Sequence, residues 1–324
     1  MPEISYRKAL NEALWEEMER DSSVVVLGED VGLYGGSFKV TKGLMDEFGE
    51  DRVVDTPISE AAIVGMATGA AMGELRPVPE LMTVNFSYLA MDQICNHLAL
   101  IRYMFGGHVR LPVTIRMPGG GGHQLGSQHS HSLEAHFVHT PGLIVVYPYT
   151  PRDAKALLKA SIRDDNPVIF LEHEGLYNSE GEVEEGLEPG TIGQAHVARE
   201  GTDVTVVGYG GMTGVCMEAA EDLADEGYEA EVIDLLTLRP WDKDAVVESV
   251  SKTHRLVVVE ECPPMCAIGT EVATNIYELA FDQMDAPIQR VSGADVHLPY
   301  AKELEQACIP HAPDVVEAAL KTLA

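Results

Sequence analysis

Short segments that are apolar throughout alternate along this chain with segments of helical periodicity. The helix-spaced series from Tyr6 to Met18 precedes the apolar run Val24–Leu27. Later, Pro151–Arg163 has helical spacing with proline near its start, and the apolar run Pro167–Leu171 follows it. Apolar runs without polar alternation are typical of strands that are buried on both faces. The pattern therefore predicts an α/β fold with mainly parallel sheets covered by helices.

The alternation is interrupted once, by the glutamate-rich stretch at 178–190. This stretch has five glutamates and three glycines without an apolar period, which predicts a solvated connection or a short hairpin near a domain boundary. A chain of 324 residues is long enough for two domains, which we place at 1–187 and 188–324. Further strands are expected at 78–84, 111–117, 204–207, 230–235 and 255–259, and further helices at 59–73, 89–104, 213–225 and 269–280.

The net charge of the chain indicates which kinds of binding partner to expect. There are 22 basic and 52 acidic residues, so the formal net charge is −30. Nucleic acids and anionic membranes are recognised through Lys and Arg, so neither is an expected partner. A basic protein partner and a high-salt habitat both fit the acidity. The N-terminus has no apolar signal-peptide core, and no run approaches the ~18 apolar residues of a membrane-spanning helix, so a cytoplasmic location is expected.

The five cysteines are scattered and odd in number, which does not indicate a disulfide framework.

A glycine-rich segment, VVGYGGMTG at 206–214, is a candidate dinucleotide site. It follows an expected strand and opens an expected helix, with Asp234 about 20 residues further on. It departs from the G-x-G-x-x-G pattern of dinucleotide sites. We prefer the simpler interpretation that its glycines let a strand turn tightly into a helix.

Histidines concentrate after a second glycine-rich stretch, in the window that runs from His123 to His139. No H-E-x-x-H motif is present, so a zinc site is not indicated. His129 and His131 alternate, and in an extended segment they would point in opposite directions. Imidazole moves protons near neutral pH, which makes His129 a candidate catalytic residue.

Glu60 opens the helix expected at 59–73, with Ser59 placed to cap it. An acidic residue in the first helical turn is favourable by itself, because it interacts with the helix dipole. The next thirteen residues carry no charge, so this helix is expected to be buried. A carboxylate at its start could share a proton with a bound base.

Together these segments resemble the β subunit of the thiamine-diphosphate-dependent component of 2-oxo acid dehydrogenases, with the pyruvate dehydrogenase type most similar. The matching segments run in order along nearly the whole chain: VVVLGEDVG, DTPISEAAIVGMATG, ELMTVNFSYLAMDQI, IRYMFGG, IRMPGG, SQHSHSLEAHFVHTPGL, TPRDAKALLKASIRDDNPVIFLE and DLLTLRPWD. The resemblance implies a transketolase-like pyrimidine-binding domain followed by a C-terminal domain of transketolase type.

The resemblance also implies roles for single residues. Glu60 matches the glutamate that hydrogen-bonds the aminopyrimidine ring of the cofactor. That bond favours the imino tautomer, whose nitrogen removes the thiazolium proton, and the resulting carbanion attacks the 2-oxo acid. Phe86 matches an aromatic position beside the pyrimidine. His129 matches the active-site histidine, which donates a proton as the acyl group passes to a lipoyl arm. His131 stands where many relatives have glutamine.

Cofactors and partners follow from the same resemblance. SIRDDNP is similar to a structural potassium loop, although a helix that simply ends at Asn-Pro would have the same sequence. The implied ligands are Val113, Ser161, Ile162, Asp164 and Asn166. The G-D-G motif of the family's diphosphate and magnesium site is absent from this sequence. An α subunit is therefore expected to hold Mg²⁺ and the diphosphate, in a heterotetramer of two α and two β chains that docks on a lipoyl acyltransferase core.

The sequence thus predicts oxidative decarboxylation of pyruvate and reductive acylation of a lipoyl domain, together with an α subunit. Branched-chain 2-oxo acid dehydrogenase and acetoin dehydrogenase are alternatives within the family. A NAD-dependent dehydrogenase that uses VVGYGGMTG, and an acidic scaffold subunit without chemistry of its own, are more distant alternatives.

Overall fold

The computed structural model describes residues 2–324, which form two compact units. The first unit contains the chain up to Gly119 together with His136–Ile192, and the second contains Gly120–Ala135 together with Gly193–Ala324. The division at 192 lies five residues beyond the expected boundary. The assignment of Gly120–Ala135 to the second unit is one that no feature of the sequence indicates.

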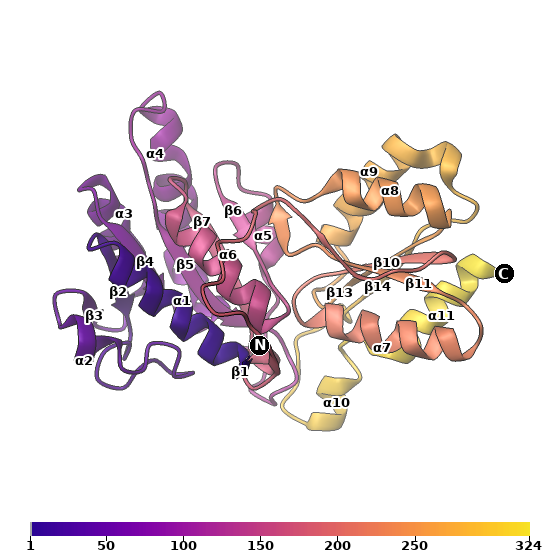
Figure 1. The fold of residues 1–324 in the computed structure, drawn as a ribbon, viewed down its shortest axis with the longest axis horizontal. Helices are drawn as coiled ribbons and strands as arrows, with labels where there is room; N and C mark the ends of the chain where they lie inside the picture. The colour runs from indigo at the N-terminus through magenta and orange to yellow at the C-terminus, as the bar shows by residue number, and fades with distance from the viewer. Residues whose placement is uncertain (1) are drawn as a thin grey trace. The chain divides into compact units, whose positions relative to one another are not determined.

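The first unit is a parallel sheet with helices packed around it (Figure 1). Its strands lie in the order β6-β7-β5-β4-β2-β3, and every neighbouring pair is parallel. The elements in chain order are β1 (Glu3–Ser5), α1 (Tyr6–Arg20), β2 (Val24–Gly28), α2 (Leu44–Phe48), β3 (Val53–Asp55), α3 (Glu60–Met72), β4 (Arg76–Glu80), the 3₁₀ segment η1 (Val84–Ala90), the π-helical segment η2 (Asp92–Leu98), α4 (Ala99–Met104), β5 (Thr114–Gly119), β6 (Ile144–Val146), α6 (Pro151–Arg163), β7 (Val168–His173), the 3₁₀ turn η3 (Glu174–Leu176) and β8 (Glu180–Glu182).

Helices α1 and α6 pack against each other in this unit, and their sequences explain their ends (Figure 1). Ser5 caps α1, because its side chain accepts a hydrogen bond from the Lys8 amide. Thr150 caps α6 in the same way, and Pro151 occupies the first turn, where a missing N–H costs nothing. The prediction of a helix over Pro151–Arg163 is confirmed.

Two segments of the first unit differ from expectation. The glutamate-rich stretch is largely accessible to solvent, as expected of a solvated connection, but it forms no hairpin of its own, because β8 pairs antiparallel with β1 from the start of the chain. The helix expected at 89–104 is built of η1, η2 and α4, with 3₁₀, π and α geometry in succession. π-Helical turns are often found beside functional sites, and changes of helical geometry leave no sequence signal comparable to hydrophobic periodicity.

The second unit is built on a five-stranded sheet in the order β14-β13-β10-β11-β9, in which only β9 is antiparallel. The expected α/β fold with mainly parallel sheets is thus confirmed in both units. The elements in chain order are α5 (Glu134–Val138, which crosses from the second unit into the first), β9 (His196–Arg199), β10 (Val204–Gly208), α7 (Gly211–Asp225), β11 (Ala230–Asp234), β12 (Thr237–Arg239), α8 (Lys243–Thr253), β13 (Leu256–Glu260), α9 (Ile268–Ala280), the 3₁₀ turn η4 (Phe281–Gln283), β14 (Gln289–Ser292), α10 (Lys302–Gln306) and α11 (Ala312–Leu323).

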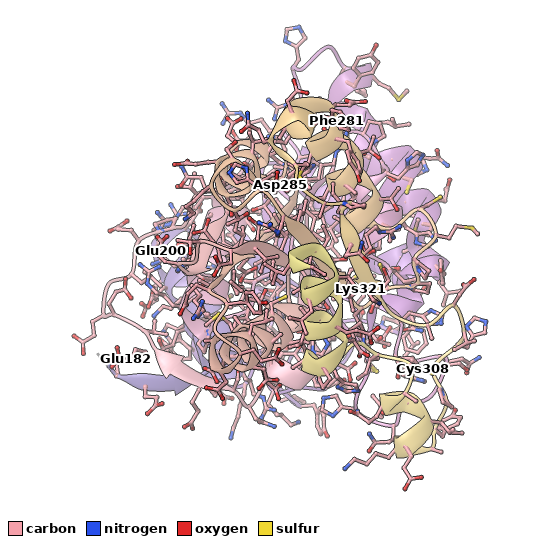
Figure 2. The ribbon with its side chains drawn as sticks, turned by 90° about the vertical axis from the view of Figure 1, so that its right-hand side faces the viewer. Glu182, Glu200, Phe281, Asp285, Cys308 and Lys321 are labelled. Atoms are coloured by element: carbon pink, nitrogen blue, oxygen red, sulfur yellow. The ribbon has the colours of Figure 1, made fainter. Side chains whose placement is uncertain are left out.

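The core of the second unit lies between its sheet and helices α7 and α11. Small and branched side chains dominate it, including Val206 on β10 and Val315 on α11, both fully buried. The opposite face of α11 carries the exposed Lys321, which pairs with Glu317 one turn earlier (Figure 2). None of the helices formed by residues 2–324 is long and apolar enough to cross a membrane.

Candidate active site

Glu60 lies in the first unit, at the first residue of α3. Its side chain is buried, and no cation lies within ion-pairing distance of it among residues 2–324. Ser59 occupies the N-cap position as expected, but its side chain makes no capping hydrogen bond. The start of α3 therefore holds a buried carboxylate that the helix dipole stabilises and that no side-chain cation of the described chain neutralises.

Glu29 is a second buried carboxylate close to Glu60, and the sequence analysis missed it. It directly follows β2, whose last residue Gly28 pairs with Asp55 at the end of β3, shortly before α3 begins. Burial raises the pKa of Glu29, and the negative charge of Glu60 raises it further. One carboxylate oxygen of Glu29 is buried without a hydrogen-bond partner in the described chain. The carboxyl ends of parallel strands are the usual place for ligands in such sheets.

Gly28 makes this arrangement possible. A Cβ at this position would stand 2.6 Å from the backbone oxygen of Glu80 on the neighbouring strand β4. The chain can therefore approach β4 closely only because residue 28 has no side chain. In the motif V-V-V-L-G-E-D this glycine immediately precedes Glu29, which is the one local signal that could have pointed to the second carboxylate.

Phe86 lies on η1, which packs against α3. Its ring is half-buried. The predicted aromatic residue and the predicted glutamate thus lie on two elements that contact each other within the first unit. The expectation that α3 is buried throughout is wrong, because Met66 and Met72 are about half exposed on it. An uncharged helix need not be buried in its own chain when one of its faces is left for a partner.

A different group of buried charges lies between β4, β5 and β7. Arg116 on β5 is 1% exposed, and its guanidinium is 2.5 Å from a carboxylate oxygen of Glu80 and 2.7 Å from one of Glu172. The Tyr177 hydroxyl donates a further hydrogen bond of 2.7 Å to Glu172. The two carboxylates raise the pKa of Arg116, which outweighs its burial. Arg116 is the shared counter-ion of both carboxylates, and burial raises the pKa of Glu80, so the group is a structural network whose charges have partners within it.

His129 lies in the second unit, in the loop that Gly120–Ala135 contributes to it. Its side chain is half-buried, and its backbone amide donates to the Gly126 carbonyl at 3.1 Å. Gly126 has φ +75°, a conformation that favours glycine. The neighbouring His131 stacks on His297, with ring centroids 5.7 Å apart. Glu60 and His129 therefore belong to different units, each with its own local framework.

The remaining histidines of the window have other surroundings. His136 and His139 are exposed, and His136 makes an edge-to-face contact with Tyr88. All five cysteines are free, and no cluster of three or more His, Cys, Asp or Glu side chains suited to a metal occurs within residues 2–324.

The VVGYGGMTG segment forms the turn between β10 and α7, as the simpler interpretation predicts. A Cβ at Gly208 would lie 2.8 Å from the Cys216 sulfur, so the glycine permits close packing of the helix on the strand. Asp234, the acidic residue of the dinucleotide interpretation, is buried at the end of β11 and accepts a hydrogen bond from the Leu236 amide.

The predicted potassium ligands gather at the end of α6 in the first unit. The guanidinium of Arg76 donates to the carbonyl oxygens of both Ile162 and Asp164, each at 3.1 Å. The Val113 carbonyl accepts from the Val168 amide at 2.8 Å. Because a carbonyl oxygen has two lone pairs, each can still bind a cation. The oxygens thus suit a hard cation, and a cationic side chain already contacts two of them.

The second unit also buries a carboxyl group that the sequence analysis did not single out. Glu134 is 1% exposed and accepts a hydrogen bond of 2.9 Å from the Tyr209 hydroxyl. Burial raises the pKa of Glu134 to about 7, although the bond from Tyr209 lowers it in part. The Cys262 sulfur lies 3.8 Å from the same hydroxyl, and burial raises the pKa of this thiol.

Comparison with known proteins identifies the family of both domains. The transketolase pyrimidine binding domain matches residues 2–180, and the transketolase C-terminal domain matches residues 193–315. The pyruvate dehydrogenase E1 component subunit beta-2, mitochondrial, of Oryza sativa subsp. japonica is 46% identical over 321 residues, which cover 98% of this chain and 85% of that protein. The pyruvate dehydrogenase E1 component subunit beta of Rickettsia felis is 46% identical over 319 residues, covering 98% of both chains. The chain belongs to the pyruvate dehydrogenase E1 component subunit beta family.

A solved structure supports the same family fold. A split gene transketolase, described as an inactive β4 tetramer, is 27% identical, has a TM-score of 0.81 and covers 99% of this chain and 98% of its own. The predicted resemblance and the predicted pair of transketolase-type domains are confirmed by these matches. As a member of an E1 β family, the chain is a component of a thiamine-diphosphate-dependent 2-oxo acid dehydrogenase.

Proposed function

We propose that this chain, together with an α subunit, catalyses the oxidative decarboxylation of pyruvate and the reductive acylation of a lipoyl domain. The observation that carries the proposal is the pair of buried carboxylates at Glu60 and Glu29, which have no cationic partner among residues 2–324. Such a pair suits a basic heterocycle that can share a proton with it. The names of the relatives, pyruvate dehydrogenase E1 component subunit beta, support pyruvate as the substrate.

Glu60 would hold the aminopyrimidine ring of thiamine diphosphate through one ring nitrogen. The start of α3 keeps its carboxylate out of bulk water, which strengthens a proton-sharing hydrogen bond. Glu29 would disfavour any further negative charge beside Glu60 and so favour a ligand that brings a proton. Phe86, on the adjoining η1, would provide an apolar wall. When bound, thiamine diphosphate supplies the electron-accepting ring on which 2-oxo acids are decarboxylated.

His129 would serve the transfer of the acyl group to the lipoyl arm. Its imidazole is half-buried in a loop, where it can reach a substrate and exchange protons near neutral pH. In this role it donates a proton and stabilises the charge that develops during transfer. His131, which stands where many relatives have glutamine, would influence this imidazole only indirectly, because its own ring stacks on His297.

The α subunit would supply the site for the diphosphate and for Mg²⁺. The sequence of this chain lacks the G-D-G motif that holds them, and the relatives carry the designation subunit beta. The apolar side chains Ile58, Met66 and Met72, exposed on and just before α3, suit a covered interface. We expect a heterotetramer of two α and two β chains that docks on a lipoyl acyltransferase core. We also expect the oxygens around Ile162 and Asp164 to bind K⁺.

Turnover by the reconstituted α and β pair tests this proposal. The pair, with thiamine diphosphate and Mg²⁺, is given pyruvate, branched-chain 2-oxo acids or acetoin in separate assays with a free lipoyl domain. We expect kcat/KM for pyruvate to exceed the other values at least tenfold, and no turnover by the β chain alone. A higher value for branched-chain acids or acetoin would replace pyruvate by that substrate. Full activity of the β chain alone would refute the shared site.

A further inference from the structure

The loop that carries His129 is closed at its base within the second unit. The Gly120 amide donates to the His131 carbonyl at 3.1 Å, so the two sides of the loop meet eleven residues apart. Between these points the chain has glycines at 120, 121, 122 and 126 and forms no helix or strand. Such a segment gains little order from its own backbone, so its conformation depends on contacts from elsewhere.

Glu261, which follows β13, joins the two sides of this loop. One oxygen of its carboxylate accepts a hydrogen bond of 2.6 Å from the Gly121 amide and another of 3.0 Å from the Ser132 hydroxyl. The same atom therefore contacts the residue after Gly120 and the residue after His131. A charged acceptor makes stronger hydrogen bonds than a neutral one, so this contact fixes the width of the loop at its base.

Glu305 on α10 holds the loop between its base and its turn. It is fully buried, and both of its oxygens accept from the Gln124 amide, at 3.1 and 3.0 Å. The Gln124 side chain donates a third bond of 2.8 Å to the same carboxylate. Helix α10 ends shortly before Cys308, which is labelled in Figure 2.

The turn beyond Gln124 is held by close packing. A Cβ at Gly126 would lie 2.3 Å from a ring carbon of Tyr300, so the tyrosine ring rests directly on the glycine. His129 follows three residues later and donates its amide to the Gly126 carbonyl. The imidazole is thus attached to a segment whose base, middle and turn are each held by a different residue of the second unit.

We propose that Glu261 and Glu305 are positioning residues that hold the glycine-rich loop so that the His129 imidazole is correctly placed for acyl transfer. This inference rests on the proposed function of His129. Neither carboxylate needs to contact substrate; each acts through the loop. A shift of about 1 Å in a catalytic group can cost on the order of 100-fold in rate, so loss of either residue should be visible in kinetics.

A double-mutant cycle in the reconstituted complex tests the inference. We expect Glu305→Ala and Glu261→Ala each to lower kcat for reductive acylation of a lipoyl domain about 10- to 100-fold, with KM for pyruvate changed less than about twofold. The double variant Glu305→Ala/His129→Ala should be no slower than His129→Ala alone, because both changes remove the same contribution. Multiplication of the two effects in the double variant would overturn the inference.

Glu303→Ala is the matched control, because Glu303 lies on the same helix as Glu305 but is exposed. Its kinetics and thermal midpoint should equal those of the wild type. If Glu305→Ala unfolds the second unit, Gln124→Gly provides the second variant. It keeps the backbone bond to Glu305 and suits the φ of +56° at this position. We expect a smaller loss of kcat that is again absent when His129 is alanine, and an unchanged kcat would overturn the inference.

The outcomes separate this inference from the proposed function. Unchanged acylation by His129→Ala would refute the proposed role of His129 and, with it, the positioning role of Glu261 and Glu305. Slow acylation by His129→Ala, together with wild-type acylation by folded Glu261→Ala and Glu305→Ala, would refute positioning alone and leave the function of His129 intact.

Discussion

The first unit buries two groups of carboxylates, and within the part of the chain that the structure describes only one of these groups has a cationic partner. Glu80 and Glu172 lie on either side of Arg116, which is paired with both. Glu29, which follows β2, and Glu60, which begins α3, lie close enough for one charge to affect the other, and no cation accompanies them in the described chain. The first group has its counter-ion built in, whereas the second lacks one.

This difference distinguishes residues that stabilise the fold from residues that we propose for the cofactor site. A buried ion pair can be replaced by apolar groups with little loss, but removal of one partner leaves an uncompensated charge at high cost. A buried carboxylate without a partner is itself costly, and a chain retains it where a ligand or a proton completes it. We therefore propose that Arg116 and its two partners stabilise the fold, whereas Glu60 and Glu29 belong to the cofactor site.

Replacement of Arg116 should have the largest effect. Arg116→Met leaves two adjacent carboxylates buried without a counter-ion, and we expect it to lower the free energy of unfolding by about 3–5 kcal/mol. Thermal or urea denaturation followed by circular dichroism measures this. The triple variant Arg116→Met/Glu80→Gln/Glu172→Gln removes all three charges together and should recover most of the loss. If Arg116→Met were as stable as the wild type, Arg116 would not be the counter-ion on which Glu80 and Glu172 depend.

Glu134 extends the comparison to the second unit, where a buried carboxyl faces a tyrosine instead of a cation. Its pKa of about 7 lies above the ordinary value of 4.5, so the folded protein binds the proton more tightly than the unfolded chain does. Stability contributed by this proton should fall as the pH rises from about 4.5 to about 7, by roughly 3 kcal/mol at most, and stay level above pH 7.

Glu134→Gln removes this titration. Differential scanning calorimetry between pH 5 and pH 8 should show a smaller decrease of the thermal midpoint in the variant than in the wild type. Glu303→Gln, on the exposed side of α10, is the control and should follow the wild type. Identical pH profiles for Glu134→Gln and the wild type would contradict the neutral state of this carboxyl below pH 7.

Glu29 gives a smaller effect of the same sign. Its pKa is raised by burial and by Glu60, so the folded state again retains the proton longer than the unfolded chain as the pH rises. Above the ordinary carboxyl pKa, Glu29→Gln should therefore raise the thermal midpoint of the β chain by a few degrees at most. The gain should shrink toward pH 4. A variant that is less stable than the wild type at pH 8 would mean that Glu29 already has a compensating partner.

Exchange of cations gives the smallest expected effect. Arg76 already donates to two of the predicted potassium ligands, so K⁺ adds to an existing positive charge. We expect KCl to raise the thermal midpoint by one or two degrees over tetramethylammonium chloride at equal ionic strength. Arg76→Met should make the chain less stable and more dependent on K⁺. Equal thermal midpoints in both salts, for the wild type and for Arg76→Met, would refute K⁺ binding at this site.

The extent of prediction from sequence differs between elements. The apolar run Val24–Leu27 and the helix Pro151–Arg163 are found as expected, because periodicity and capping residues are local signals. The strand β8 could not be expected from its sequence, since three residues of a glutamate-rich stretch pair with β1 at the start of the chain. Long-range pairing of short polar strands has no local sequence signature.

The site divides in the same way. Glu60 could be found because a carboxylate beside thirteen uncharged residues is conspicuous, and a family motif surrounds it. Glu29 was missed because its significance depends on Glu60, which is 31 positions away along the chain. Glu261 and Glu305 were missed because each contacts the His129 loop from more than 120 residues away, as the bonds to Gly121 and Gln124 show. Such contacts form only when the chain folds, so the sequence around an acidic residue does not predict them.

The central claim is that the Glu60 carboxylate shares a proton with the aminopyrimidine ring. Exchange of the thiazolium C2 proton into deuterium oxide, followed by NMR in the reconstituted complex with thiamine diphosphate bound, tests it directly. Glu60→Gln keeps the shape of the side chain but removes the proton acceptor, so we predict exchange at least about 100-fold slower than in the wild type. Exchange at the wild-type rate in a folded, cofactor-loaded Glu60→Gln complex would contradict the account.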